Sequence, residues 1–173
     1  MAGAIRELRL MRRGDGSLYD ISLPGYKANL SDVLAAIAVV QLGKLERHAE
    51  IRARQFALYD EAVAELEGIA PLVRDARDTH ALHLYIVRID AERAGATRDE
   101  YQHALAEELI STSIHFLPVH RLTWYLERFR GDCPVAERAG SEVLSLPLSP
   151  AHSDVDIGDA IDALRRVHAR FTG

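Results

Sequence analysis

Eight consecutive apolar residues, Val33 to Val40, constrain the fold of this chain more than any other feature of its sequence. They belong to one long helical pattern that runs from Ser31 to about Leu66, apolar on every side at first and amphipathic afterwards. A helix that is apolar all round is normally buried against other protein surface. We therefore expect the first half of this helix to be buried, its charged middle to be exposed, and Gly68 and Pro71 to mark its end.

A polar loop directly precedes this helix and places a glycine, a cation and an amide at its positive end. These residues are Gly25, Lys27 and Asn29. Free backbone amides and the helix dipole attract anions at such an end, so the loop is a candidate anion site. The same residues also fit a plain turn at Gly25, followed by Asn29 or Ser31 as the N-cap of the helix.

The rest of the chain alternates between strand and helix patterns. A capping box at Thr97 and Glu100 predicts a helix to about Glu108, and Ser153 is expected to cap a last amphipathic helix. Strands are predicted at 81–89, 113–116 and 143–146, with short helices at 124–129 and 134–140. Three strands among helices, including the long N-terminal helix, predict a small α+β domain with flanking helices and no internal boundary.

Composition narrows the class of partners and the compartment. The 173 residues carry a net charge of -5, so no basic field is available to attract nucleic acid. Cys133 is the single cysteine, which excludes an internal disulfide and indicates a reducing compartment, with the cytoplasm as the default. The start of the sequence lacks a signal-peptide pattern, and the longest apolar run is too short to span a bilayer. We expect a soluble protein with neither nucleic acid nor membrane as a partner.

Four segments follow one another in an order that matches a known family. They are the loop and helix from Gly25 to Leu45, the segment from His80 to Arg88, the turn from Ser113 to His120, and the segment from Ala136 to Leu148. Together they resemble the small C-terminal domain of the DegT/DnrJ/EryC1/StrS family of sugar aminotransferases, which depend on pyridoxal phosphate and have the fold-type I transferase fold. The resemblance covers the chain from about Tyr19 onward.

The resemblance implies that a second, large domain holds most of the cofactor site. In the family, the large domain supplies the lysine of the Schiff base, the acid beside the pyridinium nitrogen and the aromatic ring that stacks on the cofactor. Residues 1–18 are accordingly interpreted as an arm or linker remnant, and 19–173 as the small domain. We expect no catalytic residue in this chain, and pyridoxal phosphate binding only when a large domain completes the site.

The resemblance also assigns candidate binding residues. In related dimeric enzymes the loop reaches the cofactor phosphate of the partner subunit, which implies cofactor contacts from Gly25, Lys27 and Asn29. A lysine suits phosphate as a mobile point charge. The candidate substrate residues are Tyr26, His115 and His120. Of the two histidines, His120 is favoured, because it matches the family histidine near the sugar-nucleotide pocket, whereas His115 also fits a side chain packed on a strand end.

Other polar and aromatic residues are assigned structural roles. No metal site is expected, since His80 and His83 would point to opposite faces of a strand and Cys133 has no cysteine or histidine at ligand spacing. Core or edge positions are expected for three aromatic residues, Tyr85, Trp124 and Tyr125. Arg52, Arg54 and Tyr59 match an arginine-rich helix of the family, and a solvated helix face is expected for all three.

Two functional hypotheses follow. In the first, the chain is the C-terminal portion of an aminotransferase that moves an amino group from an amino acid, usually glutamate, to a nucleotide-linked keto-sugar in cell-surface polysaccharide or deoxyaminosugar synthesis. It would be a truncated or split product that pairs with a large-domain fragment or with a homo- or hetero-dimer partner. In the second, it is a non-catalytic remnant or interaction module that pairs with an intact homologue. Both predict an exposed apolar face on the chain alone.

Overall fold

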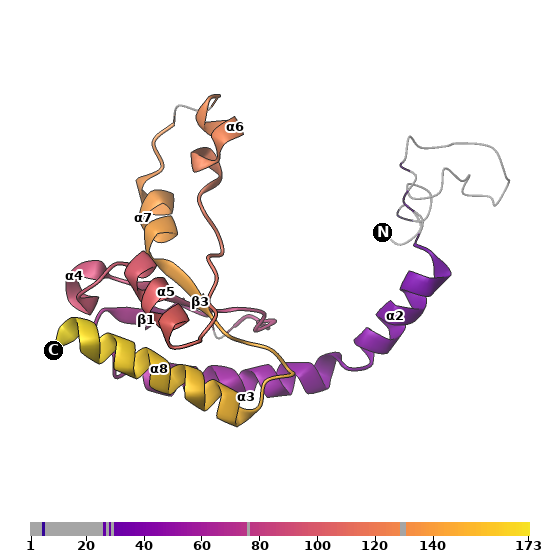
Figure 1. Ribbon diagram of the computed structural model, residues 1–173. Helices are drawn as coiled ribbons and strands as arrows, with labels where there is room; N and C mark the ends of the chain where they lie inside the picture. The colour runs from indigo at the N-terminus through magenta and orange to yellow at the C-terminus, as the bar shows by residue number, and fades with distance from the viewer. Residues whose placement is uncertain (1–4, 6–25, 27, 29, 76, 129–130) are drawn as a thin grey trace, which may run out of the picture. The chain divides into compact units, whose positions relative to one another are not determined.

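The computed structural model describes residues 5, 26, 28, 30–75, 77–128 and 131–173 (Figure 1). They fall into two compact units, Met1–Leu45 and Glu46–Gly173. In the described part of the chain, no helix is both long enough and apolar enough to cross a bilayer.

Helix α2 (Asp32–Leu42) is the described helix of the first unit. Ser31 is its N-cap, and the Ser31 hydroxyl accepts a hydrogen bond from the Leu34 amide at 3.3 Å. No residue of α2 is buried, and Val33 and Val39 are 72% and 70% exposed. The expected burial of this apolar helix is therefore wrong for the chain alone. A helix is buried only where another protein surface faces it, and a local sequence pattern does not say where that surface is.

The long N-terminal helical pattern is broken in the structure. Helix α3 (Leu45–Val63) follows α2 after a turn at Gly43 and Lys44, where the Lys44 amide donates to the Gln41 carbonyl at 3.1 Å. Glycine is a weak helix former, which explains why one pattern becomes two helices at this point. Helix α3 also ends three residues before the predicted Leu66.

The sheet of the second unit has three antiparallel strands in the order β1-β2-β3. Their bounds are β1 (Ile69–Pro71), β2 (Tyr85–Ile89) and β3 (Val143–Leu146). The pairing places Ile69 opposite Ile89 and Tyr85 opposite Leu146. The predicted α+β fold with a three-stranded sheet is confirmed.

The identity of one strand differs from the prediction. Residues 113–116 form only an isolated bridge, between Ser113 and Ser145, and β1 takes the third place in the sheet. Sequence pattern missed β1 because it has three residues and ends at Pro71, which has no amide hydrogen and is tolerated at a sheet edge. Strand β2 starts at Tyr85 rather than Ala81, after Leu82 adopts a φ of +49°.

Six further helical segments complete the second unit. They are α4 (Ala91–Ala94), α5 (Arg98–Glu107), η1 (Val119–Arg121), α6 (Thr123–Leu126), α7 (Pro134–Glu142) and α8 (Asp154–Thr172). Both predicted caps are present: Thr97 forms a capping box with Glu100, and Ser153 forms one with Asp156. Segments η1 and α6 lie on a long excursion of the chain between α5 and α7 (Figure 1).

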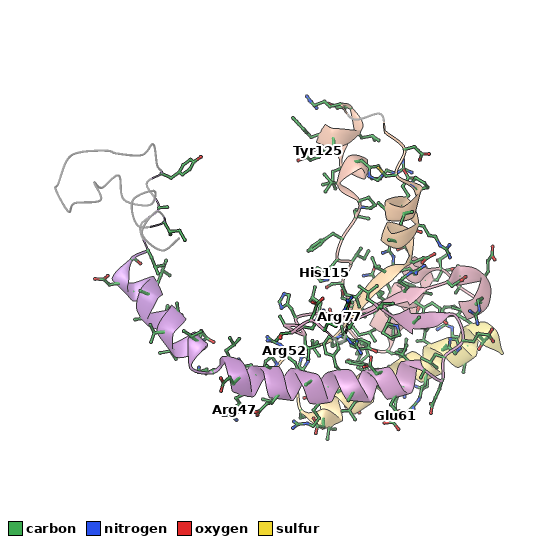
Figure 2. All side chains as sticks on the ribbon, turned by 180° about the vertical axis from the view of Figure 1, so that it is seen from behind. Arg47, Arg52, Glu61, Arg77, His115 and Tyr125 are labelled. Carbon is green, nitrogen blue, oxygen red and sulfur yellow. The ribbon has the colours of Figure 1, made fainter. Side chains whose placement is uncertain are left out.

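The core lies where α3, α5 and α8 meet the sheet. Helices α3 and α8 run side by side, and Arg165 of α8 pairs with Glu65 just beyond α3 at 2.9 Å (Figures 1 and 2). The rings of Tyr59 and Tyr85 stack with centroids 4.7 Å apart, and both side chains are fully buried. Tyr85 thus has its predicted core position. The solvated face expected for Tyr59 is wrong, because its ring packs on Tyr85 and its hydroxyl donates to the Pro147 carbonyl at 2.8 Å. Trp124 is 60% exposed, because the four-residue helix that carries it buries none of its side chains.

Candidate functional site

The turn that carries the two candidate histidines begins at β3. The Ser113 and Ser145 backbones exchange two hydrogen bonds, of 3.2 and 2.8 Å. His115 Nδ1 lies 2.8 Å from the hydroxyl oxygen of Ser145, which is buried. His115 is half-buried and sits at the base of the excursion that leads to Tyr125 (Figure 2). Both interpretations of His115 therefore have support, since its imidazole packs on a strand residue and still has a solvent-accessible part.

Helix α7 fixes His120. The Nε2 atom of His120 lies 3.1 Å from Glu137 Oε1, and Arg121 Nε lies 3.5 Å from the same oxygen. A carboxylate only accepts hydrogen bonds, so Nε2 carries the proton in this contact. The His120 side chain is 12% exposed. One turn thus holds both histidines, but His115 is anchored on β3 and His120 on α7.

Exposed apolar side chains surround these histidines. Phe116, Leu117 and Val119 are all exposed. The Phe116 ring lies edge to face with the His115 ring, and the two ring centroids are 4.7 Å apart. Oriented imidazoles beside apolar surface are typical of a site that binds an organic ligand through a few polar contacts. This turn is the part of the described chain that best fits a substrate-binding role.

Most of the candidate cofactor loop lies outside the residues that the structure describes. Gly25, Lys27 and Asn29 lie outside the described residues, and Tyr26 is exposed. The position of Ser31 as N-cap agrees with one of the two caps considered for a plain turn. The expected contacts of Gly25, Lys27 and Asn29 with a cofactor phosphate remain predictions.

The described residues do not make a complete pyridoxal phosphate site. The cofactor forms a Schiff base with a lysine, and the sequence has two lysines, Lys27 and Lys44. Lys44 is exposed in the turn between α2 and α3. The described residues therefore supply no buried lysine for a Schiff base.

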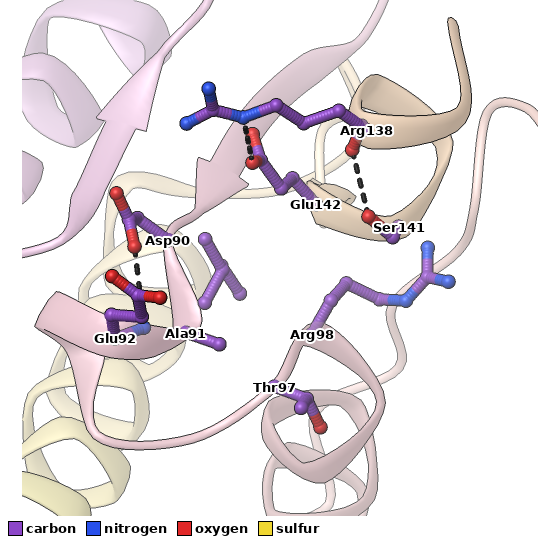
Figure 3. Close-up of a pocket in the computed structure, with 9 residues that line it drawn as sticks. Asp90, Ala91, Glu92, Thr97, Arg98, Arg138, Ser141 and Glu142 are labelled. Carbon is purple, nitrogen blue, oxygen red and sulfur yellow. Dashed lines mark hydrogen bonds and ion pairs between the residues drawn. The ribbon is translucent and has the colours of Figure 1, made fainter. Parts of the chain in front are cut away.

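A hollow of about 450 Å³ lies between β2, α5 and α7 (Figure 3). Three of its charged residues, Arg98, Arg138 and Glu142, pair within the protein. Glu142 accepts hydrogen bonds from the Nε atoms of Arg138 and Arg88, each at 2.7 Å. Arg98 donates to the Val143 carbonyl at 2.9 Å and pairs with Asp99. No sequence motif points to this hollow, and the paired arginines and Glu142 favour a structural role.

A second, more apolar hollow of about 280 Å³ is lined by both His80 and His83. The sequence places these histidines on opposite faces of a strand, but the structure has them in the loop before β2. The Leu82 amide donates to His80 Nδ1 at 2.9 Å, which helps shape this loop. No group of three or more metal-ligating side chains occurs among the described residues.

A partly buried polar network adjoins this hollow through Arg74, which lines it. The Tyr85 hydroxyl donates to Asp60 at 2.8 Å, and Asp60 also pairs with Arg74. Burial, followed by the hydrogen bond to Asp60, raises the pKa of Tyr85 above its ordinary value. Tyr85 is therefore a neutral hydrogen-bond donor in the core and has no acid–base role at neutral pH.

The sheet and its flanking helices define the class of fold as a small α+β domain, and the histidine turn is its candidate ligand site. A family model described as the DegT/DnrJ/EryC1/StrS aminotransferase family matches residues 2–165. The chain belongs to this family. The match begins before Tyr19, where the resemblance read from the motifs starts.

Individual relatives agree with this assignment. The spore coat polysaccharide biosynthesis protein SpsC of Bacillus subtilis is 39% identical over 154 residues, which cover 86% of this chain and 39% of SpsC. DesI, solved in the presence of its TDP-sugar product, is 29% identical with a TM-score of 0.83, covering 98% of this chain and 43% of DesI. The PLP form of the sugar aminotransferase Spr1654 from Streptococcus pneumoniae is 27% identical with a TM-score of 0.80, covering 97% of this chain and 43% of Spr1654. The chain spans about two fifths of the length of these relatives.

Proposed function

We propose that this chain is the C-terminal portion of a pyridoxal phosphate-dependent aminotransferase acting on nucleotide-linked keto-sugars, with glutamate as the amino donor. The family match over residues 2–165 supports the reaction class. The polysaccharide role in the name of SpsC and the TDP-sugar product in the DesI structure support the substrate class. The cofactor, when bound, supplies the electron sink for amino transfer.

The single observation that carries the proposal is the anchored turn from His115 to His120, in a chain that belongs to this family. His115 is held by Ser145 and His120 by Glu137, so both imidazoles have defined orientations before any ligand binds. Preorganised donors bind a polar ligand with less loss of conformational entropy. In this proposal His120 and His115, with Tyr26, contact the nucleotide-sugar, and Gly25, Lys27 and Asn29 contact the cofactor phosphate.

The proposal requires a second component. A large domain, on a fragment or on a dimer partner, would supply the Schiff-base lysine and complete the cofactor site in the cytoplasm. The test mixes the purified chain with the large-domain fragment of a related enzyme, pyridoxal phosphate, glutamate and a TDP-linked keto-sugar, and measures the amino-sugar by mass spectrometry. We expect product in the mixture and none with either component alone. A mixture that forms a cofactor-loaded complex yet yields no amino-sugar would contradict the proposal.

Replacement of Lys27 by alanine tests the phosphate contact. Loss of a charge-assisted hydrogen bond should weaken cofactor retention in the reconstituted complex by roughly 1.5 to 3 kcal/mol. The measurement is equilibrium dialysis of pyridoxal phosphate against the complex. Lys44→Ala is the matched control, because it removes the other lysine from an exposed turn. Equal cofactor affinity in Lys27→Ala and in the control would show that Lys27 makes no such contact.

The unburied surface of α2 favours one alternative function. An apolar helix with no buried residue is typical of a segment that binds another protein surface, so the chain would also serve as a non-catalytic module that pairs with an intact homologue. Stable association with such a homologue, without any gain of aminotransferase activity over the homologue alone, would favour this alternative.

A further inference from the structure

Helix α7 meets the histidine turn at two points on one face. Glu137 and Gly140 are three residues apart and therefore lie on the same side of the helix. Glu137 binds His120 and Arg121, as described above. Gly140 meets Pro118, the residue that precedes segment η1. The turn is thus seated on α7 through one polar and one apolar contact.

The contact at Gly140 leaves no room for a side chain. A methyl group built on Gly140 would lie 2.6 Å from Pro118 Cγ and closer still to Pro118 Cδ, whereas real Cβ atoms essentially never come within 3.0 Å of another heavy atom. Gly140 is buried within the helix, and its φ is not in the left-handed region. Because glycine weakens a helix interior relative to alanine, the close approach of Pro118 is the physical reason for glycine here.

We infer that Gly140 is a positioning residue: it lets Pro118 seat on α7, and this seat sets the place of His120 in the sugar-nucleotide site. A larger residue at 140 would displace Pro118, and His120 lies only two residues further along the turn. His115 is held separately by Ser145 on β3, so the displacement should act on His120 first. The inference rests on the proposed role of His120 in binding the nucleotide-sugar.

The packing part is tested on the purified chain by NMR of its histidine side chains. We expect Gly140→Ala to shift the His120 imidazole resonances and weaken the cross-peak between His120 and Glu137, and to leave those of His168 in α8 unchanged. Gly158→Ala is the matched control, because α8 also contains this glycine but a methyl group there would meet nothing within 4 Å. Unchanged His120 signals in Gly140→Ala would overturn the inference.

A complementary variant separates positioning from a general loss of structure. Pro118→Ala removes Cγ and Cδ, so the double variant with Gly140→Ala replaces the ring atoms by the new methyl group and should restore the His120 signals. A double variant as perturbed as Gly140→Ala alone would overturn the inference. If Gly140→Ala fails to fold, Pro118→Ala alone must shift the His120 signals, since it empties the same contact.

The functional part is tested in the reconstituted complex with a TDP-sugar as the probe. Loss of one well-placed hydrogen bond predicts up to about tenfold weaker binding in Gly140→Ala, with recovery in the double variant. A shifted His120 signal with unchanged affinity would overturn the inference and the role of His120 in sugar binding. A wild-type complex that binds no TDP-sugar, with the NMR result as expected, would instead count against the proposed function.

Discussion

At the scale of single residues, hydrogen-bond roles are often fixed by counting protons. The Tyr101 hydroxyl donates to the Ala94 carbonyl at 2.9 Å and lies 2.8 Å from His168 Nδ1. A hydroxyl has one proton and a carbonyl only accepts, so His168 Nδ1 must donate to Tyr101. Burial lowers the pKa of His168 and raises the pKa of Tyr101 to about 12. Both groups are therefore neutral in the folded protein at pH 7.

This arrangement predicts a stability that depends on pH. The pKa of His168 is lower in the folded chain than its unfolded value of about 6.5, so the unfolded chain binds more protons as the pH falls. The contribution is fully present above about pH 6.5 and is lost as the pH falls through the folded pKa. We expect the free energy of unfolding in urea to decrease from pH 7 to pH 5, and to decrease less in His168→Gln.

His103 provides the control for this prediction. It lies on α5 with an exposed side chain beside Glu107, so His103→Gln should not lessen the decrease in the free energy of unfolding from pH 7 to pH 5. If the free energy of unfolding depends on pH as strongly in His168→Gln as in the wild type, groups other than His168 cause the dependence.

At the scale of elements, the sequence predicts best what depends on neighbouring residues. The capping boxes at Thr97 and Ser153 are confirmed, because a cap needs only residues three positions apart. Strand β1 was missed, since its pairing with β2 places Ile69 opposite Ile89, twenty residues away. Residues 113–116, predicted as a strand, form a turn that is held at Ser145. This contact also joins residues far apart in sequence, so the local pattern does not reveal it.

The candidate site shows the same limit. The motif identified His115 and His120, but their anchors, Ser145 and Glu137, are 30 and 17 residues away in sequence and follow only from the fold. Pro118 on Gly140 is likewise a tertiary contact with no local signal. Contacts of the cofactor loop at Lys27 remain predictions, because Lys27 lies outside the described residues.

Helix α2 is the element whose exposed apolar side chains most clearly require another protein surface to cover them. Its apolar side chains are exposed all round, and covering each would contribute roughly 1.5 to 3 kcal/mol. Ile37→Asp together with Val39→Asp places charges on opposite sides of α2. We expect this double variant to abolish association with a large-domain fragment in size-exclusion chromatography with light scattering.

The matched control for α2 is Ala57→Asp, which adds a charge to an exposed position on α3. It should leave association intact, and all variants should retain the thermal unfolding of the wild type, because neither helix position lies in the core. Association that persists in the Ile37 and Val39 double variant would show that α2 is not the contact.

At the scale of the whole molecule, length is the central fact. The chain belongs to an aminotransferase family but spans about two fifths of the length of the relatives it matches, with coverages of 39% and 43%. The candidate sugar-binding turn is formed within Glu46–Gly173, whereas the proposed cofactor contacts lie before α2. In the proposed function, this chain contributes to a site that it shares with a partner.

An absorbance spectrum tests this claim most directly. The purified chain is titrated with pyridoxal phosphate alone, and then after mixing with the large-domain fragment of a related enzyme, while the visible band of protein-bound cofactor is followed. The fragment alone with the cofactor is the control. We expect no band with the chain alone and a band in the mixture that exceeds the band of the fragment alone. No such increase in the mixture, or a full band with the chain alone, would contradict this claim.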